Sequence, residues 1–196
     1  VHTAASYDAT SFGSLVTPDE AYAFARGKPL TIALRGDPEG FQAPTVRIGS
    51  PLDFMAVTDH AESLGEAKLC YDPRVHAYDA LVCKLYRGDV RLPVEERLQP
   101  IMRLISFAIF GGDRSVRICG EDGAQCRQRA ETVWQANQRS TEAWQDTSAT
   151  CGFTTFHAYE YTLAVESSNL HRNVIFKNAS VPQSLLSAKE ADSPAQ

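Results

Sequence analysis

Five side chains of the kinds that bind metal ions or transfer protons occur near the ends of expected strands. They are three imidazoles and two carboxylates, at His2, Asp8, His60, Glu160 and His171. In α/β folds with parallel strands, functional residues gather where the carboxyl ends of the strands meet. Imidazole combined with carboxylate is the ligand composition of sites for Zn, Mn or Fe. These residue types in these positions therefore predict a metal site.

Each of these residues also has an ordinary structural role open to it. Asp8 suits a turn in which the side chain binds its own backbone, and the two outer histidines suit solvated or loop positions. Asp59 and His60 suit a helix cap and its neighbour, and Glu160 suits the solvent face of an alternating strand. The spacing alone leaves both interpretations open.

Two further histidines are not expected at the site. His76 lies on an expected helix among charged residues, where a solvated position is the simplest assignment. His157 is offset from Glu160 by an odd number of residues within one strand, so the two side chains face opposite sides. Trp134 and Trp144 are most simply core or helix-packing residues.

The elements that must position the site residues alternate between strand and helix patterns. Thr17, Pro18 and Glu20 form a capping box with proline at the first helical position, and this helix should stop at Gly27. Strands separated by helical segments indicate an α/β fold with a largely parallel sheet. So few strands cannot close a barrel, and a barrel-like fold would need residues outside this chain. The expected strands are 1–3, 51–58 (buried on both faces), 153–164 and 173–176, and the expected helices are 75–86, 94–110 and 123–146.

Composition and charge exclude several classes of protein. A chain of 196 residues suits one domain, and its 43% hydrophobic and 22% charged residues argue against a largely disordered chain. The 19 Lys and Arg against 24 Asp and Glu give a net charge of −5, with no basic block to bind nucleic acid or anionic membranes. No apolar run approaches the roughly 20 residues that span a bilayer.

Five cysteines leave the redox state open. Their spacing lacks a metal-site pattern, and an odd number leaves at least one of them unpaired. Buried thiols in a cytosolic protein are one interpretation, and one or two disulfides in an exported protein are the other. The polar, glycine-bearing loop between Cys119 and Cys126 suits a bridge, but the spacing does not settle the connectivity.

Four sequence strings taken together resemble a family of metal-dependent phosphoesterases. The strings at 2–9 (HTAASYDA) and 53–62 (DFMAVTDHAE) resemble the first two motifs of the PHP (polymerase and histidinol phosphatase) superfamily. The strings at 153–162 (FTTFHAYEYT) and 169–176 (NLHRNVIF) look like a PHP-related family, the domain of unknown function 3604. The similarity runs over essentially the whole chain.

The resemblance implies a distorted (β/α)7 barrel, of which this chain is a part, with up to three divalent metal ions (Zn, Mn or Fe). His2 would match the second histidine of an opening His-x-His pair. Asp8 and His60 would match ligands of one metal ion.

Glu160, His171 and Asp59 receive their roles from the same resemblance. Glu160 would bridge two metal ions, and His171 would bind one of that pair. Asp59 would orient one of the metal ligands without binding the metal ion itself. The resemblance thus ties catalysis most directly to Glu160, His60 and Asp59.

The resemblance also implies that residues 1–196 form a single incomplete PHP-like domain with a helical insertion at about 66–148. The chain begins one residue after the first histidine of His-x-His, and no string after Phe176 matches the later His and Asp-x-His motifs of the superfamily. We therefore expect an N-terminal fragment of a longer protein. Members of the family often carry export signals, which favours a periplasmic or secreted location and disulfide formation.

The function implied by the resemblance, for the intact protein, is metal-dependent hydrolysis of a small-molecule phosphoester, with the site incomplete in this fragment. The metal ions would bind phosphate oxygens and lower the pKa of a bound water, and the resulting hydroxide would attack phosphorus. An amidohydrolase-like metallo-hydrolase also opens with His-x-His and is the nearest enzyme alternative, although no lysine occupies a matching strand end. A catalytically inactive metal-binding or binding module is the alternative from a different class.

Overall fold

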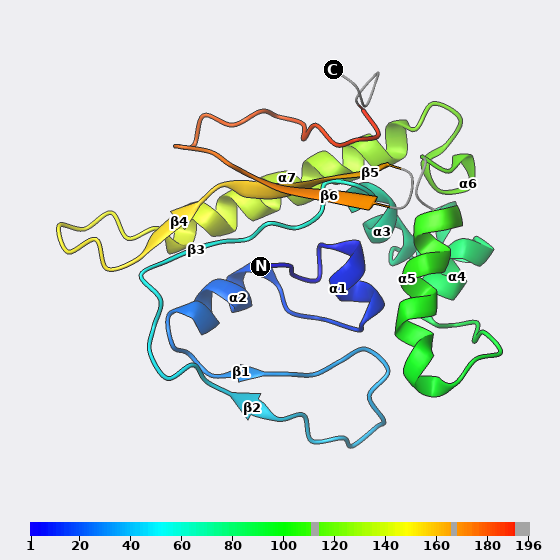
Figure 1. Cartoon of the computed structure of the whole chain (residues 1–196), viewed down its shortest axis with the longest axis horizontal. Coiled ribbons are helices and arrows are strands. Elements are labelled where there is room, and N and C mark those ends of the chain that lie inside the picture. Colours follow the sequence, from blue (N-terminus) through cyan, green and yellow to red (C-terminus); the bar gives the residue numbers. More distant parts are fainter. Residues whose placement is uncertain (111–113, 166–167, 191–196) are drawn as a thin grey trace.

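The computed structural model describes residues 1–110, 114–165 and 168–190. The long helix α7 (Ala124–Trp144) runs beside the two longest strands, β5 (Ala158–Val165) and β6 (Ser168–Ile175) (Figure 1). The other strands are β1 (Leu30–Thr31), β2 (Thr45–Val46), β3 (Phe54–Ala56) and β4 (Thr154–Phe156). The other helices are α1 (Tyr7–Ser11), α2 (Pro18–Ala25), α3 (Leu64–Cys70), α4 (Leu81–Arg87), α5 (Gln99–Phe110) and α6 (Val116–Cys119), with 3₁₀ turns at His76–Asp79 and Glu96–Leu98.

The strands of the described residues form three two-stranded sheets. β3 and β4 are parallel, whereas β1 pairs with β2 and β5 pairs with β6 in antiparallel fashion. The expectation of a largely parallel sheet therefore holds only for the β3–β4 pair. Within the described residues no barrel closes, and the (β/α)7 barrel stays a prediction. Between 66 and 148, the described residues form helices, turns and irregular loops, and none of them lies in a strand.

The strand β3 is shorter and more exposed than the apolar run at 51–58 predicts. Met55 and Val57 are buried, but Phe54 is 65% exposed, so the expectation of burial on both faces is wrong. Successive side chains face opposite sides of a strand, so Met55 and Val57 share the buried face, and Phe54 lies on the other face, where its ring is 6.3 Å from that of Phe156. Residues 1–3, expected as a strand, are not assigned to one. Two main-chain hydrogen bonds still join Val1 to the β3 segment: the Val1 amino group donates to the Ala56 carbonyl (3.0 Å), and Thr58 N–H donates to the Val1 carbonyl (2.8 Å).

The helix α2 follows the local sequence rules, whereas one expected helix and one expected strand each divide into two elements. α2 begins with the expected capping box, in which Thr17 Oγ1 accepts from Glu20 N–H (3.3 Å) and Glu20 Oε2 accepts from Thr17 N–H (2.8 Å). The expected helix at 75–86 divides at Ala80, whose backbone is extended. The expected strand at 153–164 divides at His157 into β4 and β5. The second break also changes the pairing, because β4 pairs with β3 whereas β5 pairs with β6.

Two apolar clusters hold these elements together. One lies among α3, α4, α5 and α6 and contains Tyr86 stacked on Phe107 at 4.0 Å between ring centroids. The other joins α2 to β3 and β4 through Tyr22, Val57 and Phe153. Trp134 is fully buried and donates Nε1–H to a backbone carbonyl (2.9 Å), as its assignment to the core predicts.

The cysteines form two disulfides, Cys70–Cys83 and Cys119–Cys126, and leave Cys151 free and exposed. All four bonded sulfurs belong to the first apolar cluster. The interpretation of the chain as a disulfide-bonded protein, and of the loop at 119–126 as bridged, agrees with the structure. A search of the described helices finds none that is long and apolar enough to cross a membrane.

Candidate metal centre

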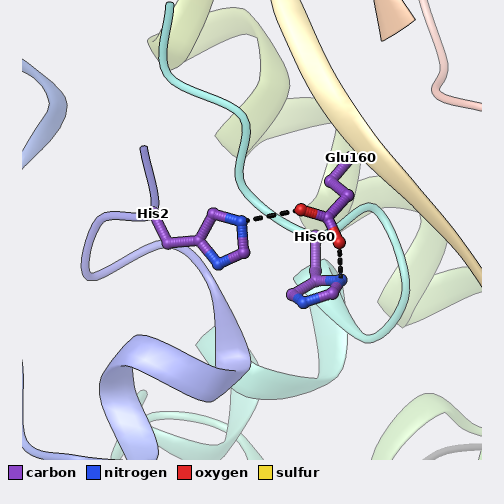
Figure 2. A group of neighbouring side chains, drawn as sticks. All are labelled: His2, His60 and Glu160. Atoms are coloured by element: carbon purple, nitrogen blue, oxygen red, sulfur yellow. Dashed lines mark hydrogen bonds and ion pairs between the residues drawn. The ribbon is translucent and has the colours of Figure 1, made fainter. Parts of the chain in front are cut away.

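The five residues singled out by the sequence lie in one cluster, built from four separate parts of the chain. Figure 2 shows His2 from the N-terminal segment and His60 from the loop after β3 converging on Glu160 of β5. An isolated parallel bridge between His60 and Glu160 continues the direction of β3 and β4, and this bridge fixes the two backbones side by side. Asp8 lies on α1, and His171 lies on β6. The end of the parallel pair is therefore the place where these side chains meet.

Glu160 is the centre of the cluster. Its Oε2 lies 2.9 Å from His2 Nε2, and its Oε1 lies 3.6 Å from His60 Nδ1 (Figure 2). The same Oε1 is in contact with His171 Nδ1. Glu160 is 8% exposed, whereas a buried carboxylate needs compensating partners. Three imidazoles around one buried carboxylate supply them.

Asp8 forms the second anionic position. Its Oδ2 lies 2.7 Å from His2 Nδ1 and 3.9 Å from His60 Nε2. Its Oδ1 is buried and has no hydrogen-bond partner among the described residues. A buried carboxylate oxygen without a partner is costly, and a cation bound at this point would satisfy it.

Asp59 occupies a different position from the other predicted residues. Its two oxygens accept from Thr3 N–H (2.5 Å) and Thr3 Oγ1–H (2.7 Å), so it anchors the segment that carries His2. Burial raises the pKa of Asp59, and the two hydrogen bonds from Thr3 oppose that rise. This arrangement suits the orienting role expected for Asp59 and does not place it among the converging side chains.

The electrostatics of the cluster favour charged carboxylates beside a protonated histidine. The hydrogen bond to Asp8 raises the pKa of His2. Burial opposes ionisation of Asp8, but hydrogen bonds from His2 and Ser6 outweigh it and hold the pKa of Asp8 well below its usual range. Burial likewise opposes ionisation of Glu160, whose pKa is nevertheless lowered by the surrounding imidazoles. The cluster thus combines two carboxylates that favour ionisation with a histidine whose pKa is raised by its contacts to them.

Sequence reasoning missed two polar residues of the cluster. Thr162 Oγ1 lies 3.0 Å from His60 Nδ1 and 3.1 Å from Glu160 Oε1, and Glu62 Oε2 lies 3.5 Å from His60 Nδ1. Thr162 follows Glu160 by two positions in one strand and so shares its face, which is a pattern that the sequence already contains. Glu62 could not be placed without knowing that its loop packs on β5.

The histidines left out of the site lie elsewhere. His157 is buried, with Nε2 3.7 Å from Glu142 Oε1, and points toward α7. His76 is exposed on a 3₁₀ turn. Both positions agree with the sequence-based expectation.

The residues of the cluster fit a divalent metal ion. One ligand atom each from His2, His60 and Glu160 lie within 4.8 Å of one another, and Asp8 adds the unpartnered oxygen. Nitrogen and carboxylate ligands of this mixture suit Zn, Mn or Fe. A second group, Glu66 with Cys119 and Cys126, does not fit, because its sulfurs are joined in a disulfide and its carboxylate is paired with cationic side chains.

The described residues form a domain of helices and small two-stranded sheets, with a carboxylate and imidazole cluster at the end of a parallel strand pair. A family model described as a protein of unknown function, DUF3604, matches residues 1–196. The chain therefore belongs to the DUF3604 family, as the resemblance of its four sequence strings predicts. No curated protein and no solved structure matches the chain.

The raised pKa of His2 predicts how the stability of the metal-free protein depends on pH. A histidine whose folded pKa exceeds its unfolded value of about 6.5 stabilises the fold below that value. This contribution is lost as the pH rises through the folded pKa. We expect His2→Asn to lower the free energy of unfolding most at about pH 5.5 and least at about pH 9. Urea titrations with a chelator present would measure the difference.

The exposed His76 provides the control for this experiment, because His76→Asn should show no such dependence. A gap between wild type and His2→Asn that widens as the pH rises would contradict the assignment.

Proposed function

We propose that the protein is a metal-dependent hydrolase, and specifically a phosphoesterase of the PHP superfamily. The observation that carries this proposal is the position of Glu160, a buried carboxylate with imidazoles on both oxygens and the unpartnered oxygen of Asp8 nearby. A buried group of this kind, assembled from distant parts of the chain and unrelated to the apolar core, is typical of a functional site.

The residues that would hold the metal ions are His2, Asp8, His60, Glu160 and His171. When bound, divalent metal ions supply Lewis-acid polarisation of phosphate oxygens and an activated water at neutral pH. Asp8 and Glu160 provide the negative charge that draws a cation into the cluster. His2 lies between these two carboxylates, and its ligating nitrogen must be free of a proton to bind a metal ion.

The substrate in this proposal is a small-molecule phosphoester. A phosphate group presents several anionic oxygens, which suit a cluster able to hold more than one cation. The partial (β/α)7 barrel belongs to the same proposal, and β3 and β4 would be two of its parallel strands.

We further propose a periplasmic or secreted location. Disulfides persist in oxidising compartments and are rare in the cytosol, and this chain has two of them in its core. The proposal is independent of the catalytic one, because a binding module could carry the same bridges.

The experiment that tests the function combines metal analysis with a substrate panel. The protein, purified without chelators, should contain about two or three equivalents of Zn, Mn or Fe by elemental analysis. It should hydrolyse members of a panel of phosphomonoesters and phosphodiesters, lose this activity with a chelator, and regain it when metal is added back. Metal without phosphoester turnover would leave the amidohydrolase-like and inactive alternatives. Absence of bound metal, including after incubation with each ion, would overturn the proposal.

A further inference from the structure

The side chain of Thr162 touches three of the proposed metal ligands at once. Its Oγ1 lies 3.0 Å from His60 Nδ1, 3.0 Å from His171 Nδ1 and 3.1 Å from Glu160 Oε1. Thr162 is 9% exposed, and it lies on β5 directly opposite His171 on β6. One hydroxyl therefore joins residues from the loop after β3, from β5 and from β6.

The hydrogen-bonding capacity of a hydroxyl allows one arrangement of these contacts. A threonine hydroxyl has one proton to donate and two lone pairs to accept with. An ionised carboxylate only accepts, so the proton of Thr162 goes to Glu160 Oε1. The two lone pairs then accept from His60 Nδ1–H and His171 Nδ1–H, and the His171 Nδ1–H also donates to Glu160 Oε1. Both rings must carry their proton on Nδ1, which leaves Nε2 as the atom with a free lone pair.

The other neighbours of His60 agree with this assignment. Glu62 Oε2 and Glu160 Oε1, at 3.5 Å and 3.6 Å from His60 Nδ1, are also acceptors, whereas Nε2 faces Asp8 Oδ2 at 3.9 Å. Glu62 is held in place because its Oε1 accepts from the backbone N–H of Thr162 (2.9 Å) and of Ala188 (3.4 Å). Carboxylate oxygens, which can only accept hydrogen bonds, thus face Nδ1 of the His60 ring.

From this geometry we infer that Thr162 is a positioning residue of the metal centre. Its hydroxyl, assisted at His60 by Glu62 and at His171 by Glu160, holds both rings in the Nδ1–H tautomer and presents the Nε2 atoms as ligands. The inference deepens the proposed function and rests on it for the identity of the ligand. The tautomers themselves are a property of the chain and can be measured without metal.

The test measures tautomers and metal affinity separately. Long-range ¹H–¹⁵N spectra of the metal-free protein at about pH 8.5, well above the ordinary histidine pKa, should show Nδ1–H for both rings, with His76 and His157 as references. Thr162→Val removes the hydroxyl but keeps the shape, and it should weaken Zn or Mn binding about 10- to 100-fold against a competing chelator. Thr162→Ser should restore both the spectrum and the affinity.

A buried threonine outside the cluster provides the matched control. Thr155 on β4 is 8% exposed and donates Oγ1–H to the Thr141 carbonyl (2.6 Å), so Thr155→Val should leave metal affinity unchanged. If Thr162→Val does not fold, Thr162→Ala takes its place, and the wild-type spectrum remains decisive.

The outcomes separate this inference from the proposed function. An Nε2–H tautomer at either ring of the wild type overturns the inference, as does wild-type affinity in Thr162→Val. The Nδ1–H pattern in a protein that binds no metal would support the tautomer assignment and overturn the proposed function alone.

Discussion

Replacing Glu160 by glutamine is expected to weaken binding of the first divalent metal ion at least about 100-fold and to abolish metal-dependent hydrolysis. Glutamine keeps the length and planar end of the side chain but removes its negative charge. Its amide nitrogen cannot accept from His2 or His171, whichever oxygen it replaces. Competition with a chromogenic chelator measures the affinity, and the phosphoester panel measures turnover.

A glutamate–histidine pair outside the cluster serves as the control for this experiment. Glu142 Oε1 lies 3.7 Å from His157 Nε2, and its side chain is 59% exposed, outside the candidate metal centre. Glu142→Gln should therefore keep wild-type metal content and turnover. Far-UV circular dichroism of both variants checks the fold. Unchanged turnover in Glu160→Gln would exclude the central role of this carboxylate, whatever the control shows.

The parts of the fold that follow local rules were predictable from the sequence. The capping box at Thr17 marks the start of α2, and the spacing of apolar residues at 123–146 predicts α7 almost to its ends. The strand β6 shows the opposite case, because it begins at Ser168 and not at 173. Most of its residues are exposed, so no apolar alternation marks the strand in the sequence. Its antiparallel pairing with β5 depends on tertiary contacts, and the order of strands and helices along the sequence does not reveal it.

The part of the candidate site that lies at the ends of parallel strands was predictable from the sequence. His60 and Glu160 converge because β3 and β4 are parallel and the chain extends both in the same direction. His171, expected just before a strand, lies inside β6 and reaches the cluster as the cross-strand partner of Thr162. The roles of Thr162 and Glu62 depend on contacts between segments about 100 residues apart. No spacing within the sequence specifies contacts of that range.

The apolar cluster of α3 to α6 connects to the candidate site through the N-terminal helix. Tyr86 donates its hydroxyl proton to the Tyr7 carbonyl (3.0 Å), and the Tyr7 ring lies 4.9 Å from that of His60. Tyr86 belongs to α4, which the Cys70–Cys83 disulfide joins to the end of α3. The disulfide thus secures the helix that packs behind α1 and the His60 ring.

Removing this disulfide is expected to produce the largest loss of stability of the changes considered. Its cysteines are separated by 13 positions, and closing a loop of that length restricts the unfolded chain by about 3 kcal/mol. The Cys70→Ala/Cys83→Ala double variant should therefore lose about 3 kcal/mol of unfolding free energy. The corresponding variant of the shorter Cys119–Cys126 loop should lose about 2.5 kcal/mol. Urea unfolding under non-reducing conditions measures both values.

The exposed free thiol of Cys151 provides the matched control, because Cys151→Ala should change stability by no more than about 0.5 kcal/mol. Alkylation of the folded, unreduced protein followed by mass spectrometry should label Cys151 alone. Metal affinity of the Cys70→Ala/Cys83→Ala variant should fall less than that of Glu160→Gln, since the bridge supports the packing behind His60 and contributes no ligand. Equal stability of the reduced and unreduced wild-type protein would contradict a structural role for the bridge.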